Sequence, residues 1–557
     1  MYVAFTKKKY KDTYHKQILL RESYREDDKV KTRTIANLSN QPKNQVEAIV
    51  AALKNKDDIA VNSSQQFQGC TIGLSFVVIF LMKQLGIFKT IGKGFKQKIA
   101  MTLIAARVSI QSSRLQALSW AQDEDKILDL LNFSLDEKNT LNNKTIYQGL
   151  DYLYDNKEII ENKLFKAHYK DKPPTRVFYD VTSSYVEGEY EDSELVAYGY
   201  NRDGKKSKQQ IVIGLLADEN GHAISIDTYP GNTNDIKTFA DQLDKLKNRF
   251  KLKNITIVGD GGMIKSEDIA TIKDMGYDYI TSIGKPSIKK LIDNKDSKIQ
   301  MGLFDEDLKE VIENNTRYIL RQNPIRRDEI AQTRESKIKR LQEFIDKKQE
   351  YYNTKYRAKQ ETLQKHIEKK LSDLKLSGFI SIVYKYEDGN VIVPSKNASD
   401  AIKTKPLISV ELIIDEVLKK EIAQLDGCYV VTTSLIDTAE NTKEDIHKAY
   451  KTLIKVENAF KTLKTEYLEI RPLYLRTDSR IKAHIFCSML AYNIVLKLKS
   501  YTKVCELDFK KTIRELSYVK TVKNKINDML EYETIPQVNE RLCQLFKQME
   551  LKLPKRI

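Results

Sequence analysis

Cysteine is scarce in this chain, and the cysteines that are present are not arranged for chemistry. Cys70, Cys428, Cys487, Cys505 and Cys543 are the only five in 557 residues, and none forms a CxxC pair. Paired spacing is typical of zinc sites and disulfide frameworks, so we expect buried thiols in a reducing cytoplasm. The glycine patterns GxGxxG and GxxxxGK[ST] are also absent, which leaves nucleotide hydrolysis without support.

Long apolar runs are missing as well. The longest, Ile72 to Met82, is too short to span a bilayer. The N-terminal residues MYVAFTKKKYKDTYHK have no apolar core behind their basic residues, so they do not read as a secretory signal. We therefore expect a soluble cytoplasmic protein without a membrane partner.

Negative charge is outweighed by positive charge. Lys and Arg number 94 against 77 Asp and Glu, which gives a net charge of +17. This excess indicates a polyanionic partner, nucleic acid before a membrane surface, although a Lys-rich composition with a solvated basic surface also explains it. The hydrophobic fraction of 41% is ample for a packed core, and the length predicts two to four domains.

Residues 1–40 form a small basic segment in which MYVAF, DTYHKQILLRESY and KVKTRTI alternate like strands. Basic residues mixed with aromatic ones suit phosphate contacts, and a small antiparallel sheet with a solvated face explains them equally well. Residues 41–172 are predicted to be a helical domain, either DNA-binding with a helix-turn-helix or a packing domain. The expected helices cover 44–55, 71–86, 95–108, 111–132 and 143–166.

A mixed α/β pattern begins at Pro173 and forms the first part of a core over 173–286. Two of its strands end on carboxylates, Asp180 and Asp260, where such sheets place their sites. Gly261 and Gly262 after the second acid allow another backbone segment to approach closely. The expected strands cover 176–181, 208–216, 222–228, 255–259 and 278–283, and the helices 234–250 and 266–275.

Residues 287–425 interrupt this pattern as an insertion with long charged helices. Residues 328–375 are predicted to form two antiparallel helices or one coiled arm. The core resumes over 426–500, with a strand at 427–433, and 501–557 is predicted as a helical C-terminal region. Short strands are expected within the insertion at 379–384 and 408–413.

The core's second part carries the most informative stretch, residues 442–467, which is predicted to be one helix with Thr442 as its N-cap. Tyr450, Glu457 and Lys464 are seven residues apart and therefore share a face. Glu457 stands beside apolar neighbours, and a carboxylate held there needs a partner such as a metal ion. Tyr450 as a half-buried aromatic and Lys464 as a solvated charge are the alternative interpretations.

Asp180, Asp260 and Glu457 can converge, since two lie at strand ends and one on a helix beside the same sheet. Hard divalent cations take oxygen ligands, and two of them activate the attacking oxygen and stabilise the leaving oxygen in phosphoryl transfer. Three carboxylates brought together without a cation raise at least one pKa. Spacing alone does not establish the cluster among 77 acidic residues.

Several ordered blocks resemble bacterial insertion-sequence transposases of the DDE type. They are FYDVTSSY, YGYNRDGKKSKQQIVIGLLAD, YPGNTND, VGDGGM and RPLYLRTDSRIKAHIF. The helix is similar to the subgroup whose third acid lies in a Tyr-x2-Arg-x3-Glu-x6-Lys signature. One position departs from it, because Leu453 replaces the arginine; Lys455 lies on another face, and we expect Leu453 to pack.

This resemblance implies an RNase H-like core in which Asp180, Asp260 and Glu457 hold Mg²⁺, with Mn²⁺ as a substitute. It implies that Tyr450 and Lys464 contact DNA. It also implies cleavage at the element's ends and attack of the exposed 3′-hydroxyl on target DNA. Arg471, Arg476, Arg480 and Lys482 form a basic cluster after the helix, which either contacts phosphate or pairs in part with Asp478. His484 is expected to be an ordinary helix histidine.

We therefore predict an endonuclease and strand-transfer enzyme of DNA transposition, a DDE transposase of a bacterial mobile element. Its partners would be double-stranded element ends and target DNA, handled by a homodimer associated with the nucleoid. The alternatives are an RNase H-like nuclease without joining activity, and a non-catalytic DNA-binding protein derived from a transposase. The second alternative predicts a lost acid, and all three acids are present.

Overall fold

The computed structural model divides the chain into two compact units. Unit 1 contains residues 1–173, 181–233 and 457–557, and unit 2 contains 174–180 and 234–456. The chain therefore crosses between the units several times. The residues that the structure describes are 1–10, 13–26, 29–54, 64–200, 204–205, 207–393, 401–471, 473–526 and 530–554.

The central sheet is mixed and has eight strands in the order β10-β11-β14-β9-β8-β5-β6-β7. Strand β8 pairs in parallel with β5 and β9, whereas β6–β7, β10–β11, β11–β14 and β14–β9 are antiparallel. Each strand expected in the two parts of the core is present. The expected strands are β5 (Arg176–Tyr185), β6 (Gln210–Asp218), β7 (Ala223–Pro230), β8 (Thr256–Val258), β9 (Asp278–Ile283) and β14 (Cys428–Thr433). The sheet also contains β10 (Lys309–Glu313) and β11 (Thr316–Gln322), from the stretch that the sequence assigns to the insertion. Strand β5 continues to Tyr185, so the expectation that it ends on Asp180 is wrong.

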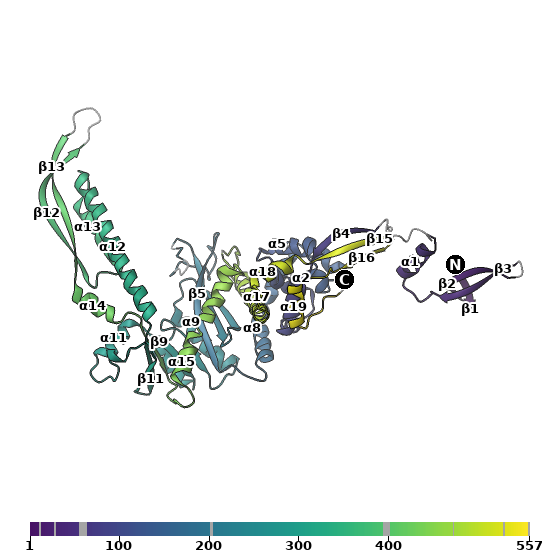
Figure 1. Ribbon diagram of the computed structural model, residues 1–557, viewed down its shortest axis with the longest axis horizontal. Helices are drawn as coiled ribbons and strands as arrows, with labels where there is room; N and C mark the ends of the chain where they lie inside the picture. The colour runs from purple at the N-terminus through teal and green to yellow at the C-terminus, as the bar shows by residue number, and fades with distance from the viewer. Residues whose placement is uncertain are drawn as a thin grey trace. The chain divides into compact units, whose positions relative to one another are not determined.

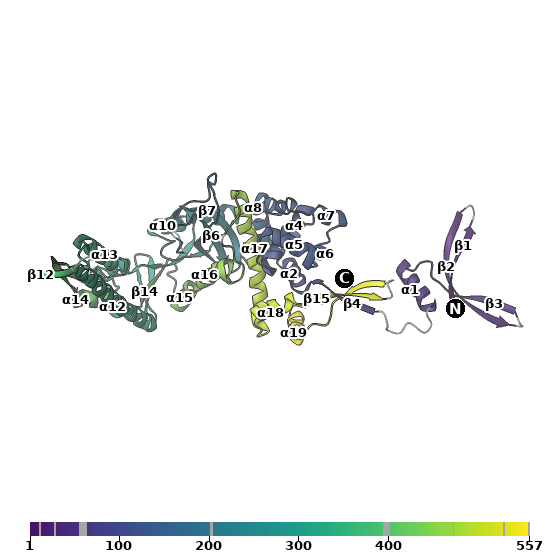
Figure 2. The same ribbon diagram turned by 90° about the horizontal axis from the view of Figure 1, so that it is seen from above.

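The long helix α17 (Asp478–Val504) forms the centre of unit 1, where it packs against α4, α8 and β7 (Figure 2). Sixteen of its residues are buried, and each large apolar one stabilises the fold by roughly 1.5–3 kcal/mol. By length and composition α17 could cross a membrane, but 83% of its apolar stretch is buried inside the protein. It is the one such helix in the described part of the chain.

Buried polar groups fix β7 to the helices of unit 1. The side chain of Asn493 on α17 accepts a hydrogen bond from Ala223 N and donates one to Ala223 O, both at 2.9 Å. The fully buried Glu161 on α8 accepts from Ser225 Oγ at 3.1 Å and pairs with Lys157 at 3.4 Å. Because unpaired buried polar groups are costly, these bonds specify the packing of the strand.

Shorter helices complete the two units. In unit 1 they are α1 (Lys43–Lys54), α2 (Gly73–Gln84), α3 (Ile87–Ile91), α4 (Phe95–Ser109), α5 (Arg114–Ser119), α6 (Ile127–Leu130), α7 (Leu135–Thr140), α8 (Gln148–His168), α18 (Phe509–Ser517) and α19 (Glu540–Gln548). In unit 2 they include α9 (Asp235–Asp244), α10 (Ser266–Asp274) and α11 (Lys285–Asp293). The helix expected over 111–132 is interrupted, with α5 and α6 separated by the π-helix Trp120–Glu124.

Two small sheets lie outside the central one. Strands β1 (Tyr2–Tyr10), β2 (Thr13–Glu26) and β3 (Lys29–Asn37) form an antiparallel sheet, as the alternation predicted. The second sheet has the order β16-β15-β4 and corrects two expectations of purely helical structure. Strand β4 (Ser64–Thr71) interrupts the helical region 41–172, and β15 (Lys520–Ile526) and β16 (Leu530–Thr534) lie in the C-terminal region 501–557. Pairing between β4 and β15 joins residues more than 400 positions apart, which a local pattern does not reveal.

The insertion in unit 2 folds around its own core (Figure 1). Helices α12 (Pro324–Thr354) and α13 (Gln360–Asp373) pack on the hairpin β12 (Ile380–Val393) and β13 (Ala401–Ile414), followed by α14 (Glu416–Gln424). Residues such as Leu341, Ile345 and Ile367 fill the interface, which confirms two helices with a thin apolar stripe. We call α12 to α14 the arm.

The arm leaves and re-enters the central sheet at one point. Gln322 on β11 pairs with Cys428 on β14, and Asn323 N donates to Gly427 O at 2.9 Å. Gly427 has φ of +73°, and a Cβ there would lie 2.4 Å from Asn323 O, so the junction requires glycine. Because β10 and β11 belong to the sheet, the segment outside it begins at Pro324 instead of near residue 287.

Candidate active site

Asp180 and Asp260 lie at matching positions on two neighbouring parallel strands of unit 2. Phe178 on β5 is in register with Val258 on β8, and each aspartate comes two residues later. Gly259 N still donates to Ile280 O on β9 at 3.2 Å, so the chain stays in line with the sheet up to the second acid. Side chains two residues apart share a face, and neighbouring strands are about 4.8 Å apart. Asp180 lies within β5, which continues to Tyr185, and Asp260 lies just past the end of β8, so the two residues are neighbours across adjacent strands.

The side chain of Asp260 is held by the turn that follows it. Its Oδ1 accepts hydrogen bonds from Gly262 N at 3.0 Å and Met263 N at 2.8 Å. Its backbone carbonyl accepts from Met263 N and Ile264 N, which closes the turn before α10. The carboxylate is exposed but has a fixed orientation, as a ligand-binding group requires.

Gly261 makes this turn sterically feasible. A Cβ at this position would lie 2.3 Å from the backbone oxygen of Ser282 on β9, closer than any real contact. At Gly262, the nearest atom to such a Cβ would be Asp260 Oδ1 at 3.3 Å. The predicted close approach of backbone after Asp260 is confirmed, and Gly261 is the residue that permits it.

Glu457 is exposed on a short helix, α16 (Ile454–Lys461), between the buried residues Val456 and Ala459. The single helix expected over 442–467 is wrong, since α15 (Lys443–Lys451), α16 and a π-helix over Thr462–Glu466 follow one another. At the first junction Thr452 Oγ1 donates to Lys448 O at 2.9 Å. A threonine hydroxyl that bonds back to the preceding turn competes with the helix ladder.

The helix tightens at this junction before it resumes. Leu453 N bonds to Tyr450 O and Val456 N to Leu453 O, which are contacts three residues apart. Leu453 is buried at 9% exposure, so its expected packing is confirmed. Tyr450 and Lys464 are both half-buried.

The described residues contain no group of three or more His, Cys, Asp or Glu that could hold a metal ion. Asp180 and Asp260 belong to unit 2, and Glu457 is the first residue of the last segment of unit 1. Their convergence on a shared cation therefore stays a prediction.

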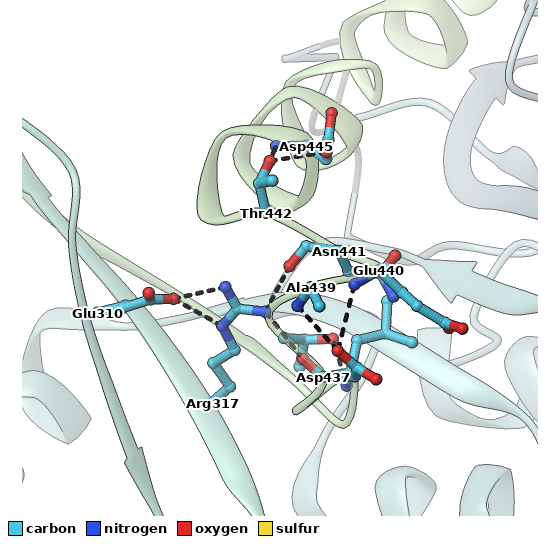
Figure 3. A network of polar contacts seen from close by, with 10 residues as sticks. Glu310, Arg317, Asp437, Ala439, Glu440, Asn441, Thr442 and Asp445 are labelled. Atoms are coloured by element: carbon cyan, nitrogen blue, oxygen red, sulfur yellow. Dashed lines mark hydrogen bonds and ion pairs between the residues drawn. The ribbon is translucent and has the colours of Figure 1, made fainter.

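A buried arginine that the sequence analysis missed anchors the loop before α15 (Figure 3). Arg317 on β11 is fully buried, and its Nε and Nη2 both donate to Glu310 Oε2 on β10. Its Nη1 donates to the carbonyls of Leu435 at 3.3 Å and Asn441 at 2.7 Å. One guanidinium thus ties two sheet strands to both ends of the loop. The sequence signal that could have revealed its burial is the alternation of the strand, because Arg317 lies two residues before Ile319 and therefore on the same buried face.

The same loop is organised by its own side chains (Figure 3). Asp437 Oδ1 accepts from Ala439 N at 2.8 Å and Glu440 N at 3.2 Å. Thr442 Oγ1 accepts from Asp445 N at 3.1 Å and so caps α15, as predicted. Arg317 therefore holds Asn441, the residue before this cap, against the central sheet.

The basic cluster after the helix is only partly accessible. Arg480 forms a bidentate pair with Asp151, with Nε–Oδ1 at 3.0 Å and Nη2–Oδ2 at 3.3 Å, and its guanidinium lies 4.4 Å from the Tyr147 ring centroid. The hydrogen bond to Asp151 raises the pKa of Arg480. Arg476 is exposed, and Arg471 and Lys482 are half-buried.

Two neighbours of this cluster have structural contacts. The expected pairing of Asp478 with the cluster is not what the structure shows, because its carboxylate accepts hydrogen bonds from Ser193 Oγ and from Glu194 N and Leu195 N. His484 is a buried helix histidine beside Arg107, and burial keeps its pKa well below the usual value.

Comparison with known proteins identifies the family. The family model described as Transposase DDE domain matches residues 171–494, which is 324 of 557 residues (494 − 171 + 1). The model described as IS1634 family transposase, N-terminal domain, matches residues 3–65. No curated protein matches the chain.

Two solved structures are similar at low identity. A piggyBac transposase synaptic complex with hairpin DNA is 10% identical, with 80% of this chain and 76% of that chain covered and a TM-score of 0.35. A Mos1 transposase paired-end complex with left transposon end is 14% identical, with 30% and 58% covered and a TM-score of 0.14. From the extent of the first family match, this chain belongs to the transposases that carry a DDE domain, and its N-terminal residues match the IS1634 family of insertion-sequence transposases.

Proposed function

We propose that this protein cleaves DNA at the ends of an insertion sequence and joins the exposed 3′-hydroxyl to target DNA. The observation that carries the proposal is the matched position of Asp180, within β5, and Asp260, two residues past the end of the adjacent parallel strand β8. In the family to which the chain belongs, these would be the first two acids, and Glu457 the third. Strands β5 to β9 have the spatial order 3-2-1-4-5, which supports an RNase H-like core.

The two aspartates have the chemistry that a hard divalent cation requires. Both offer carboxylate oxygens, and the backbone bonds to Asp260 Oδ1 orient its second oxygen. Asp180, Asp260 and Glu457 would hold Mg²⁺, which Mn²⁺ can replace. When bound, such ions supply charge stabilisation to the attacking and leaving oxygens of phosphoryl transfer.

The chain's own residues would position the DNA strand and orient the nucleophile. Because Tyr450 lies on α15, Glu457 on α16 and Lys464 on the following π-helix, their seven-residue spacing does not itself place them on one face. From the resemblance to the family signature, we propose that Tyr450 and Lys464 contact the DNA near the cleaved phosphate. Arg471, Arg476 and Lys482 are proposed to contact phosphates further along the strand. The net charge of +17 supports a DNA partner. A homodimer would hold two ends together, in the cytoplasm and on the nucleoid.

The test is a cleavage and joining assay with DNA that contains the element ends and Mg²⁺. Asp180→Asn, Asp260→Asn and Glu457→Gln should each abolish cleavage while DNA binding is retained. Glu444→Gln, on the exposed side of α15, is the matched control and should stay active. Retained cleavage in any one of the three would remove that residue from the site.

The products distinguish this function from the alternatives. Joined products exclude a nuclease that only cuts, whereas cleavage without joining supports it. Cleavage that persists in excess chelator would contradict the proposed use of a divalent cation. Absence of cleavage with intact DNA binding would favour a non-catalytic DNA-binding protein.

A further inference from the structure

A basic cavity of about 350 Å³ lies within unit 1, between the loop that joins α4 to α5 and residues 469–475. Its volume falls within the range of roughly 300–1,000 Å³ that is typical of ligand pockets. Its charged and aromatic lining consists of Arg107, Arg114, Glu469, Arg471, Tyr474 and His484.

Arg107 fixes the two walls of the cavity. Its Nη1 donates to Gln111 O and Leu468 O, both at 3.2 Å, and its Nη2 donates to Ser112 O at 3.0 Å. These partners are neutral carbonyls, so they hold the guanidinium in place without cancelling its charge. Burial lowers the pKa of Arg107, but an arginine stays protonated at neutral pH.

Arg114 has a buried donor that the described protein leaves unsatisfied. Its Nε is shielded from solvent and has no hydrogen-bond partner among the described residues. Its guanidinium lies 5.5 Å from the Tyr147 ring centroid, and Arg480 contacts the same ring. Arg480 forms an ion pair with Asp151, whereas no ion pair of Arg114 is found among the described residues. A buried donor without a partner is rare. Because Nε is shielded, a ligand in the cavity would not meet this atom, and what places Arg114 at the cavity is its position in the lining.

The charge of the lining favours an anion. Three arginines stand against one glutamate, which gives +2 (3 − 1). His484 adds no charge, because burial beside Arg107 keeps its pKa well below neutrality. Planar guanidinium groups suit the geometry of phosphate oxygens, with charge-assisted hydrogen bonds in pairs.

We infer that this cavity binds a phosphate group of the DNA backbone, with Arg114 and Arg471 as its contacts and Arg107 as a positioning residue. The inference rests on the proposed function for its choice of DNA as the source of the phosphate. It adds Arg114, on a helix far from the acids in sequence, to the DNA contacts. It removes Arg480 from them, since that side chain holds Asp151 and Tyr147.

The experiment measures binding of the full chain to a fluorescently labelled duplex of mixed sequence, between roughly 50 and 200 mM salt. Each phosphate contact contributes about 0.9 to the slope of log affinity against log salt. Arg114→Gln should lower that slope by about 0.9 and weaken binding about tenfold, as expected for a charged hydrogen bond. Arg114→Lys keeps the charge, so the slope should be retained while affinity falls because the paired donors are lost.

Lys96→Gln is the matched control, because Lys96 is an exposed cation on α4 outside the cavity. It should leave the slope closer to that of the wild type than Arg114→Gln does. Circular dichroism and thermal melts of each variant establish that it folds. If the wild-type protein shows no salt-dependent binding to DNA, the proposed function fails. If the wild-type protein binds DNA but Arg114→Gln has the same salt slope as Lys96→Gln, the cavity fails as a DNA contact.

A second arm separates DNA from free phosphate. Inorganic phosphate is titrated against the wild-type protein and Arg114→Gln, and the melting temperature is recorded. An unchanged DNA slope, together with phosphate stabilisation that is lost in Arg114→Gln, would overturn the DNA assignment in favour of a small anion. No effect in either arm would overturn the cavity as an anion site altogether.

Discussion

Replacing Arg317 by methionine tests whether one buried guanidinium holds the loop before α15. The change keeps an unbranched apolar stem and removes the bonds of the guanidinium to Glu310, Leu435 and Asn441. Loss of one partner of a buried ion pair costs roughly 3–5 kcal/mol. Because Glu310 is 32% exposed and can regain water, we expect the lower end, about 3 kcal/mol.

This loss should appear as local opening of residues 435–446. Since 1.4 kcal/mol is a factor of ten, amide hydrogen exchange there should accelerate by about 100-fold. The amides of Asn441, Asp445 and Ile446 report on it directly, because they bond to Asp437 O, Thr442 Oγ1 and Thr442 O. Exchange measured by mass spectrometry or NMR on the full chain gives the result.

Arg321→Met is the matched control for this experiment. Arg321 lies on the same strand, and its Nε donates to Glu306 O at 2.8 Å instead of to the loop. It removes the same charge and should leave exchange in 435–446 near the wild-type rate. Equal exchange in the two variants would refute the anchoring role of Arg317. A slower rate of DNA cleavage in Arg317→Met alone would link the loop to the position of Glu457.

Three further predictions concern the turn, the arm and pH. Gly261→Ala should destabilise the protein by about 1–3 kcal/mol and reduce cleavage, because the added Cβ meets Ser282 O, whereas Gly262→Ala should be milder in the same assays. Lys405→Met should destabilise the arm by about 2–4 kcal/mol, since Lys405 Nζ donates to the carbonyls of Tyr352, Lys355 and Ala358 within 3.0 Å. Limited proteolysis near residue 357 should therefore increase in Lys405→Met, whereas the exposed control Lys385→Met should be cleaved at the wild-type rate. Burial lowers the pKa of His447 to about 4, so the unfolded chain takes up a proton below about 6.5 that the folded chain does not. Stability should therefore fall as pH drops from about 6.5 to about 4, and a melting temperature equally pH-dependent in His447→Gln would contradict this.

Local patterns were sufficient for the parts of the site that depend on one strand or one turn. The strand over Asp278–Ile283 was predicted to the residue, and Asp260 was correctly placed just after a strand, whereas β5 continues to Tyr185, beyond its predicted end at residue 181. Strand alternation and the strand-end rule determine these features over a few residues. The cap at Thr442 follows from the same kind of short-range chemistry.

Features that depend on distant partners were not predicted. Arg317 is separated by more than 110 residues from the carbonyls that it binds, so its burial has no local signal. Strands β4 and β15 pair with each other although they are far apart in the sequence, and each alone has little apolar character. The helix break near Thr452 appears in backbone bonds three residues apart, such as Leu453 N to Tyr450 O, and the helical periodicity of the sequence continues through it.

The shared entry and exit point of the arm has a consequence for the history of the gene. Asn323 and Gly427 are bonded to each other, so a recombination event between their codons changes the length of the insert and leaves the pairing of Gln322 with Cys428 intact. The sheet would therefore tolerate an excursion of different length among relatives of this transposase. We expect the greatest differences in length among them to fall between these two positions.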